Sequence, residues 1–186
     1  TKTVTVDFAT ADGTATAAND YISASGTLTF NPGITSQTVS ITIVQDTIDE
    51  AHETFDVVLS NSANATISDA TGVMTITDDE TTPSLSIADA STTDETAANL
   101  TATVTLSGQS SSTVTVDYAT SDGTASAAAD YTNSSGTLTF NPGDTSQTFN
   151  IPILADTIDE NNETFSVTLS SPTNATINDL LGQFTI

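Results

Sequence analysis

The chain has 186 residues, with 24 aspartates and glutamates against a single lysine or arginine, and its formal net charge is −23. Such a chain has no basic surface to displace counterions from phosphates, which argues against nucleic acid and anionic membranes and favours a cation as partner. It has no cysteine, so disulfides and thiolate metal sites are excluded. No apolar run approaches the roughly 20 residues of a membrane-spanning helix, so we expect no membrane insertion.

The sequence contains two copies of one repeat, offset by 110 residues. The segment Gly26 to Gly33 recurs unchanged as Gly136 to Gly143, and 49 of the 76 aligned positions (1–76 against 111–186) are identical. The two copies should therefore share one fold.

The two copies are framed differently. Residues 83–110 have no counterpart in the first copy, whereas the second copy ends where the first continues into Asp78, Asp79 and Glu80. We therefore expect a partial repeat over 1–80, with the third to seventh strands, and a repeat over 81–186 that has all seven strands but lacks the acidic end.

Apolar residues alternate with threonine, serine and other polar residues along the chain, which predicts β-strands rather than helices. In the first copy the expected strands are at 4–8, 28–30, 39–43, 55–59 and 74–76. In the second copy they are at 84–88, 99–106, 113–119, 136–140, 147–153, 164–169 and 182–186. The fold class is thus all-β: two tandem immunoglobulin-like, seven-stranded antiparallel β-sandwiches, the first lacking its N-terminal strands.

If successive strands run up and down, alternate loops meet at the same end of each sandwich. Nine of the twelve acidic residues in each copy then gather at one end. In the first copy these are Asp12, Asp20, Asp46, Asp49, Glu50, Glu53, Asp78, Asp79 and Glu80. In the second copy they are Asp89, Asp94, Glu95, Asp122, Asp130, Asp156, Asp159, Glu160 and Glu163.

Carboxylates crowded together repel one another by roughly 1–4 kcal/mol per pair, depending on screening. A hard divalent cation with six to eight oxygen ligands removes this repulsion, and calcium suits flexible loops better than magnesium does. Because the chain has no thiol and only one imidazole, zinc is not expected. The sequence therefore predicts calcium binding at the acidic end.

Several motifs resemble the Calx-beta domain family. They are Asp117 to Ala125, Asp130-Tyr131, Gly136 to Gly143, Asp156 to Glu160, Glu163-Thr164-Phe165 and Thr75 to Asp79. The resemblance covers essentially the whole chain. Domains of this family are seven-stranded sandwiches that occur in sodium–calcium exchangers and in many large bacterial surface or adhesin-like proteins, and the last group is the source we expect.

The resemblance implies a ligand set by position. In the first copy it is Asp20, Asp46, Glu50, Glu53, Asp78 and Asp79, with the backbone carbonyl of Ile48. In the second copy it is Glu95, Asp130, Asp156, Glu160 and Glu163, with the carbonyl of Ile158. Calcium-sensing members carry one more aspartate where this chain has Gln45 and Ala155, so fewer ions or weaker binding should follow.

Other conspicuous residues have structural interpretations. We expect Asp12-Gly13 and Asp122-Gly123 to form turns, Tyr21 and Tyr131 to pack and anchor the loop, and His52 to be a solvated surface residue. No catalytic constellation or phosphate-binding glycine loop occurs, so we expect no enzyme.

These features together predict a calcium-binding spacer repeat of an extracellular or cell-surface adhesion protein, with calcium stiffening the joint between neighbouring repeats. Two alternatives stay open. One is a self-assembling filament subunit, in which other copies of the chain complete the first repeat by strand exchange. The other is a calcium sensor, which the departures at Gln45 and Ala155 disfavour.

Overall fold

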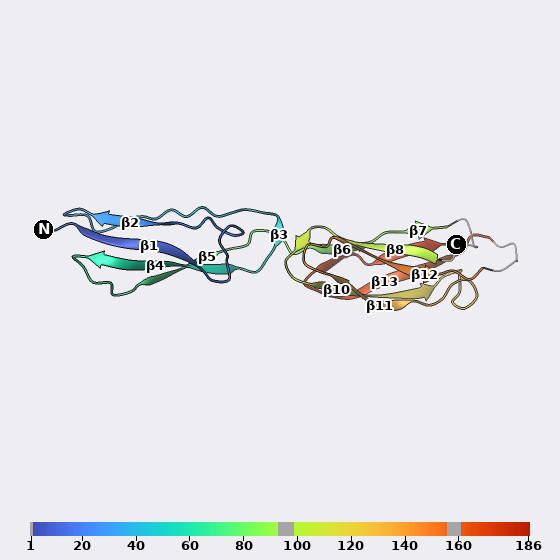
Figure 1. The fold of residues 1–186 in the computed structure, drawn as a ribbon. Helices are drawn as coiled ribbons and strands as arrows, with labels where there is room; N and C mark the ends of the chain where they lie inside the picture. The colour runs from blue at the N-terminus through green and yellow to red at the C-terminus, as the bar shows by residue number, and fades with distance from the viewer. Residues whose placement is uncertain (1, 93–98, 156–160) are drawn as a thin grey trace. The chain divides into compact units, whose positions relative to one another are not determined.

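The threonine- and valine-rich segments form β-strands in the computed structural model, which describes residues 2–92, 99–155 and 161–186 (Figure 1). Those ranges contain fifteen strands and no helix, and hence no helix suited to crossing a bilayer. The all-β, immunoglobulin-like fold expected from the sequence is confirmed. The chain forms two compact units, one of Thr1–Asp46 with Ala51–Asp79 and one of Thr47–Glu50 with Glu80–Ile186.

The first unit contains one antiparallel sheet with the strand order β2-β1-β4-β5. Its strands are β1 (Val4–Asp12), β2 (Ser25–Phe30), β4 (Glu53–Ala63) and β5 (Thr71–Ile76). The long strand β1 lies between β2 and β4, and its last residue, Asp12, is opposite Phe55 (Figure 1). This register places the loop that follows β1 beside the beginning of β4.

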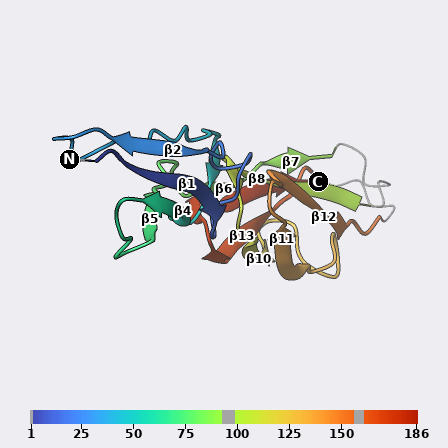
Figure 2. The ribbon, with the colours of Figure 1, turned by 60° about the vertical axis from the view of Figure 1, so that its left-hand side comes forward.

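The second unit contains two larger sheets, in the orders β11-β10-β13-β15-β7 and β12-β8-β6-β14. In both views β10, β11 and β13 lie together (Figure 2). The first sheet comprises β7 (Ala90–Ser91), β10 (Val114–Asp122), β11 (Ser135–Phe140), β13 (Thr164–Thr173) and β15 (Leu181–Thr185). The second comprises β6 (Ser84–Ile87), β8 (Asn99–Leu106), β12 (Ser146–Pro152) and β14 (Thr176–Asp179). The short strands β3 (Ile48–Asp49) and β9 (Gln109–Ser110) pair in parallel.

The core of the second unit lies between its two sheets. Leu85, Ala102 and Val104 from one sheet pack in the same cluster as Val116 and Phe140 from the other, and all five are fully buried. Burying large apolar side chains in this way contributes about 1.5–3 kcal/mol each. The alternation read from the sequence therefore corresponds to an inner face on each sheet.

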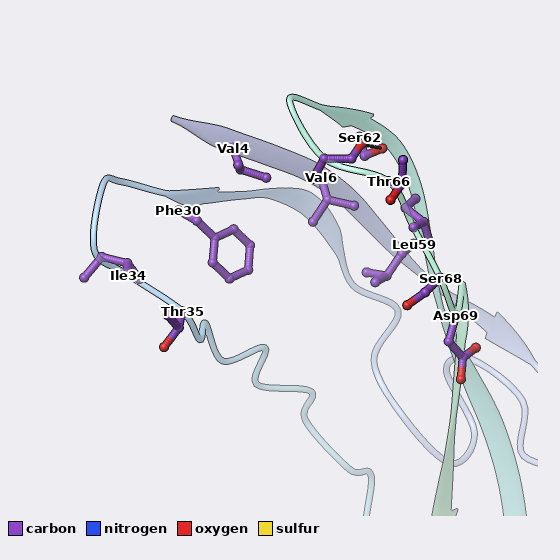
Figure 3. A pocket seen from close by; sticks show the side chains of 12 residues that line it. Val4, Val6, Phe30, Ile34, Thr35, Leu59, Ser62, Thr66, Ser68 and Asp69 are labelled. Atoms are coloured by element: carbon purple, nitrogen blue, oxygen red, sulfur yellow. Dashed lines mark hydrogen bonds between the residues drawn. The ribbon is translucent and has the colours of Figure 1, made fainter. Parts of the chain in front are cut away.

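The first unit has a much smaller core, which consists of Ala15, Tyr21 and Phe55. At the other end of its sheet, an open groove of about 440 Å³ is lined by apolar side chains (Figure 3). Phe30, Val6 and Leu59 are directed into this groove. Their counterparts in the second unit, offset by 110 residues, lie in the core cluster together with residues of β6 and β8.

The expected strand at 39–43 is wrong, since the structure has no ladder there and only an isolated bridge between Tyr21 and Ile43. In the second unit the corresponding strand β12 pairs along its whole length with β8. The described residues of the first unit include no strand in the position of β8. Alternation alone could not reveal this difference, because a strand needs a hydrogen-bonding partner.

The unchanged sequence around Phe30 and Phe140 gives a matched pair of variants. Phe140 is fully buried, so Phe140→Ala should lower the free energy of unfolding of the second unit by about 3–5 kcal/mol. Phe30 borders an open groove, so Phe30→Ala should cost the first unit about 1 kcal/mol or less. Urea denaturation followed by methyl NMR resolves the two units. Equal losses would contradict the difference in burial.

Candidate metal centre

Three carboxylates of the first repeat converge at the acidic end of the sequence pattern. One oxygen from each of Asp20, Glu50 and Glu53 lies within 4.8 Å of the other two, and all three side chains are half-buried. Asp20 comes from the loop between β1 and β2, Glu53 begins β4, and Glu50 directly follows β3. The convergence of these loops agrees with the up-and-down strand order assumed from the sequence.

Backbone contacts hold the loop after β1 against the beginning of β4. The amide of Ala15 donates to the carbonyl of Thr54 at 2.9 Å, and the amide of Thr54 donates to Thr14 Oγ1 at 2.8 Å. Glu53 is the immediate neighbour of Thr54, so these contacts bring its side chain to the loop that carries Asp20.

The Asp20 side chain is itself fixed. Its Oδ2 accepts hydrogen bonds from the amide of Thr16 at 2.6 Å and from Thr16 Oγ1 at 3.0 Å. The amide of Val44 donates to the Asp20 carbonyl at 3.0 Å. These bonds fix the orientation of the Asp20 carboxylate within the loop.

Electrostatic strain is visible at Glu53. Desolvation raises the pKa of Glu53 above its usual value, and the charge of Asp20 and a hydrogen bond with it raise that pKa further. A cation between the two carboxylates would act in the opposite direction, because it favours the charged form of both. The site is therefore arranged to gain from a bound cation.

The structure does not bring together the whole ligand set implied for the first repeat. Asp46, Asp78 and Asp79 are outside the one carboxylate cluster found among the described residues. Asp78 nevertheless lies close to the segment that carries the cluster, since its amide donates to Nδ1 of His52 at 3.1 Å. His52 is exposed, as expected from the sequence, and its contact with Asp78 has no signal in the sequence.

In the second repeat only Asp130 and Glu163 can be placed, because Glu95, Asp156, Ile158 and Glu160 lie outside the described residues. Oδ2 of Asp130 accepts from the amide of Ser126 at 2.7 Å and from Ser126 Oγ at 3.2 Å, as Asp20 does from Thr16. Backbone hydrogen bonds of 2.9 Å in both directions join Glu163 to Ile186.

The cluster found among the described residues consists of three carboxylates, which are oxygen donors. Half-buried carboxylates are suited to hard cations such as calcium and magnesium. Calcium is the larger and less strictly coordinated of these two ions.

Comparison with known proteins gives the same family for both repeats. The Calx-beta domain family matches residues 1–80 and 78–183. Sodium/calcium exchanger 1 of Canis lupus familiaris is 31% identical over 193 residues, which covers 92% of this chain and 20% of the exchanger. Sodium/calcium exchanger 2 of Homo sapiens is 44% identical over 77 residues, which covers 41% of this chain and 8% of the exchanger. The chain thus spans about a fifth of the length of exchanger 1.

Two solved structures share the fold. The crystal structure of the apo form of the Calx CBD1 domain has a TM-score of 0.52 and 26% identity, and it covers 57% of this chain and 96% of that domain. The crystal structure of CBD12 from CALX1.2 has a TM-score of 0.52 and 21% identity, and it covers 98% of this chain and 86% of that protein.

These comparisons correct one expectation. The extracellular or cell-surface location is wrong, because the curated relatives are sodium/calcium exchangers and not secreted or adhesive proteins. That location was expected from the resemblance to the large bacterial surface proteins in which Calx-beta domains also occur, and the motifs that carry the resemblance do not distinguish those proteins from the exchangers. The expected bacterial, adhesin-like source remains untested.

Glu53→Gln tests the repulsion at the site. Since the folded-state pKa of Glu53 is raised, the stability linked to its proton is present below the ordinary carboxyl pKa and lost as the pH rises through the folded value. With chelator present at neutral pH, the variant should therefore melt at a higher temperature than the unaltered chain. The gain in free energy of unfolding should be about 1 kcal/mol or less, because solvent partly screens the two carboxylates. Below pH 4 the gain should vanish. A gain independent of pH would contradict the assigned cause.

Proposed function

Because the chain belongs to the Calx-beta family, we propose that its two repeats are calcium-binding modules. The observation that carries the proposal is the cluster of Asp20, Glu50 and Glu53. Three half-buried carboxylates within 4.8 Å of one another, one with a raised pKa, lower their energy when a divalent cation binds. The relatives that this chain resembles are named sodium/calcium exchangers, and this similarity favours calcium over magnesium as the bound ion.

We extend the ligand set beyond this cluster by position in the repeat. The proposed ligands of the first repeat are Asp20, Asp46, Glu50, Glu53, Asp78, Asp79 and the carbonyl of Ile48. Those of the second repeat are Glu95, Asp130, Asp156, Glu160, Glu163 and the carbonyl of Ile158. The contact between Asp78 and His52 supports the inclusion of the end of the first repeat.

We propose that calcium also orders the chain at the segment Thr47–Glu50. It lies within the first repeat of the sequence but belongs to the second compact unit. There β3 pairs with β9, and the amide of Ser111 donates to the carbonyl of Asp49 at 3.0 Å. Asp46 and Glu53, on either side of this segment, are proposed ligands, so a bound ion orders the chain where it passes from one unit to the other.

Calcium-dependent ordering of the segment Thr47–Glu50 is compatible with a spacer role and with a sensor role. The similarity to ion exchangers favours a sensor, in which calcium occupancy sets how firmly the two repeats are connected. Gln45 and Ala155 stand where calcium-sensing members carry one more aspartate, so we propose weaker binding or fewer ions than in those members. The proposal includes no catalytic step.

Calcium titration tests the function directly. Calcium at 100 times its Kd should raise the free energy of unfolding by about 2.7 kcal/mol, and excess chelator should remove that gain. Calorimetry on the full chain should show that Asp46→Asn and Asp156→Asn each weaken binding at one repeat only. Asp56→Asn, a change outside the proposed ligand set, is the control and should bind as the unaltered chain does. A melting temperature that is indifferent to calcium and chelator would overturn the proposal.

The open groove of the first unit favours a second candidate, completion of that unit by strands from another chain. Val4, Val6, Phe30 and Leu59 line the groove, and their counterparts in the second unit pack with Leu85 of β6. In a neighbouring copy, however, β6 and β8 already belong to a filled core. Donating them would open one unit to close another, so exchange between identical chains offers no net gain in buried area.

Native mass spectrometry distinguishes the candidates. We expect a monomer at micromolar concentration, with and without calcium, because strand exchange would cost the donor its own core. A ladder of higher oligomers that collapses when Phe30→Asp makes the groove polar would support strand exchange. Assembly would then replace calcium binding as the proposed main function only if the oligomers were the same with and without calcium.

A further inference from the structure

Asp12 and Asp122 make contacts that the sequence does not indicate. Each precedes a glycine, and an Asp-Gly pair predicts only a turn. In the structure Oδ1 of Asp12 accepts two hydrogen bonds, from the hydroxyl of Tyr21 at 2.6 Å and from the amide of Ala17 at 2.9 Å. Asp122 makes the same pair, with Tyr131 at 2.6 Å and Ala127 at 2.9 Å. The arrangement thus occurs in both repeats.

The tyrosine of each pair is an interior residue. Tyr21 is 1% exposed and stacks on Phe55, with ring centroids 4.2 Å apart. Tyr131 is fully buried and stacks on Phe165 at the same distance. A buried hydroxyl needs a hydrogen-bond partner, and the aspartate supplies it. The ring position is therefore fixed by packing on one side and by the carboxylate on the other.

Each tyrosine directly follows a proposed cation ligand, Asp20 or Asp130. The intervening loop is tight: Ala18 and Ala128 adopt left-handed backbone angles, with φ of 77° and 71°, a conformation that is costly for alanine. Gly13 approaches the carbonyl of Thr54 so closely that a Cβ atom would collide with it. Contacts between the two ends of the loop must offset this strain, and the tyrosine–aspartate hydrogen bond joins those ends.

We propose that Asp12 and Asp122 are positioning residues of the two cation sites, which hold Asp20 and Asp130 in place through the hydroxyls of Tyr21 and Tyr131. The inference rests on the proposed function in one respect, namely that Asp20 and Asp130 are ligands. It separates the acids at this end of each repeat into two classes. Asp20 offers an oxygen to the ion, whereas Asp12 commits Oδ1 to the loop.

The titration behaviour of the pair agrees with this division. The hydrogen bond from Tyr21, and then that from Ala17, lower the pKa of Asp12, so it remains a charged acceptor. Burial, together with the hydrogen bond to Asp122, raises the pKa of Tyr131 to about 12, so the phenol remains a donor.

The test compares three single variants and one double variant of the full chain with one control, each titrated with calcium by calorimetry at a temperature where all are folded. Tyr21→Phe should weaken binding at the first repeat about three- to tenfold, the loss expected for one hydrogen bond. Asp12→Ala also removes the bond from Ala17 and should weaken binding by at least as much. The double variant should bind no more weakly than Asp12→Ala alone, because that change already breaks the contact with Tyr21. Asp12→Asn retains a carbonyl acceptor, so its affinity should stay within about twofold of the unaltered chain.

Asp7→Ala is the matched control. Asp7 lies on the same strand β1 and also accepts two hydrogen bonds, from Thr27 and Asn61, but outside the loop. It should lower stability without changing calcium affinity. If Asp12→Asn weakens binding as much as Asp12→Ala does, Asp12 is a direct ligand and the proposal is overturned. Unchanged affinity in Tyr21→Phe overturns it equally.

A second measurement keeps this inference separate from the proposed function. The amide of Val44 donates to the carbonyl of Asp20, so its hydrogen exchange reports how firmly Asp20 is held even without an ion. Exchange of Val44 should accelerate in Tyr21→Phe and Asp12→Ala but not in Asp7→Ala. If calcium fails to bind the unaltered chain, the proposed function fails, and this exchange pattern still decides whether Asp12 positions Asp20. No acceleration overturns the inference.

Discussion

Repulsion between carboxylates at the acidic end of the first repeat is the constraint to which the rest of the site responds. The loop after β1 and the beginning of β4 hold Asp20 and Glu53 close together, although desolvation and like charge oppose it. Such an arrangement persists only where the surrounding backbone is firmly fixed. Here the fixing comes from the Thr14–Thr54 and Ala15–Thr54 hydrogen bonds and from a buried tyrosine stacked on phenylalanine.

The two units show that the same local sequence reaches different burial in different surroundings. Gly26 to Gly33 and Gly136 to Gly143 are identical, yet Phe140 lies in a closed core and Phe30 in an open groove. The difference lies in β6 and β8, which face the sheet in the second unit. The absence of these strands from the described part of the first unit does not change burial at the acidic end, because Tyr21 and Tyr131 are both almost fully buried. The loop architecture around the site therefore depends on β1 and β4 and not on the covering strands.

Much of the fold could be predicted because period-two alternation directly reports which face of a strand is buried. The proximity of Asp20 and Glu53 followed from loop parity, once the strands were counted. Three features could not be predicted in this way. Residues 39–43 alternate but form no ladder, His52 accepts a bond from the Asp78 amide, and Asp12 accepts one from Tyr21. Each depends on a partner that alternation and charge do not identify, or on the absence of a partner strand from the described residues.

The sequence by itself determined that this chain is a duplicated all-β module with its acids gathered at one end, since repeat identity, alternation and charge are local properties of the string. The tertiary structure decided which acids face one another and which are committed to the loop. It separated Asp20 from Asp12, eight positions apart, because the tyrosine hydroxyl turns toward one carboxylate and the beginning of β4 toward the other. Such directions are set by packing, and a sequence pattern does not contain them.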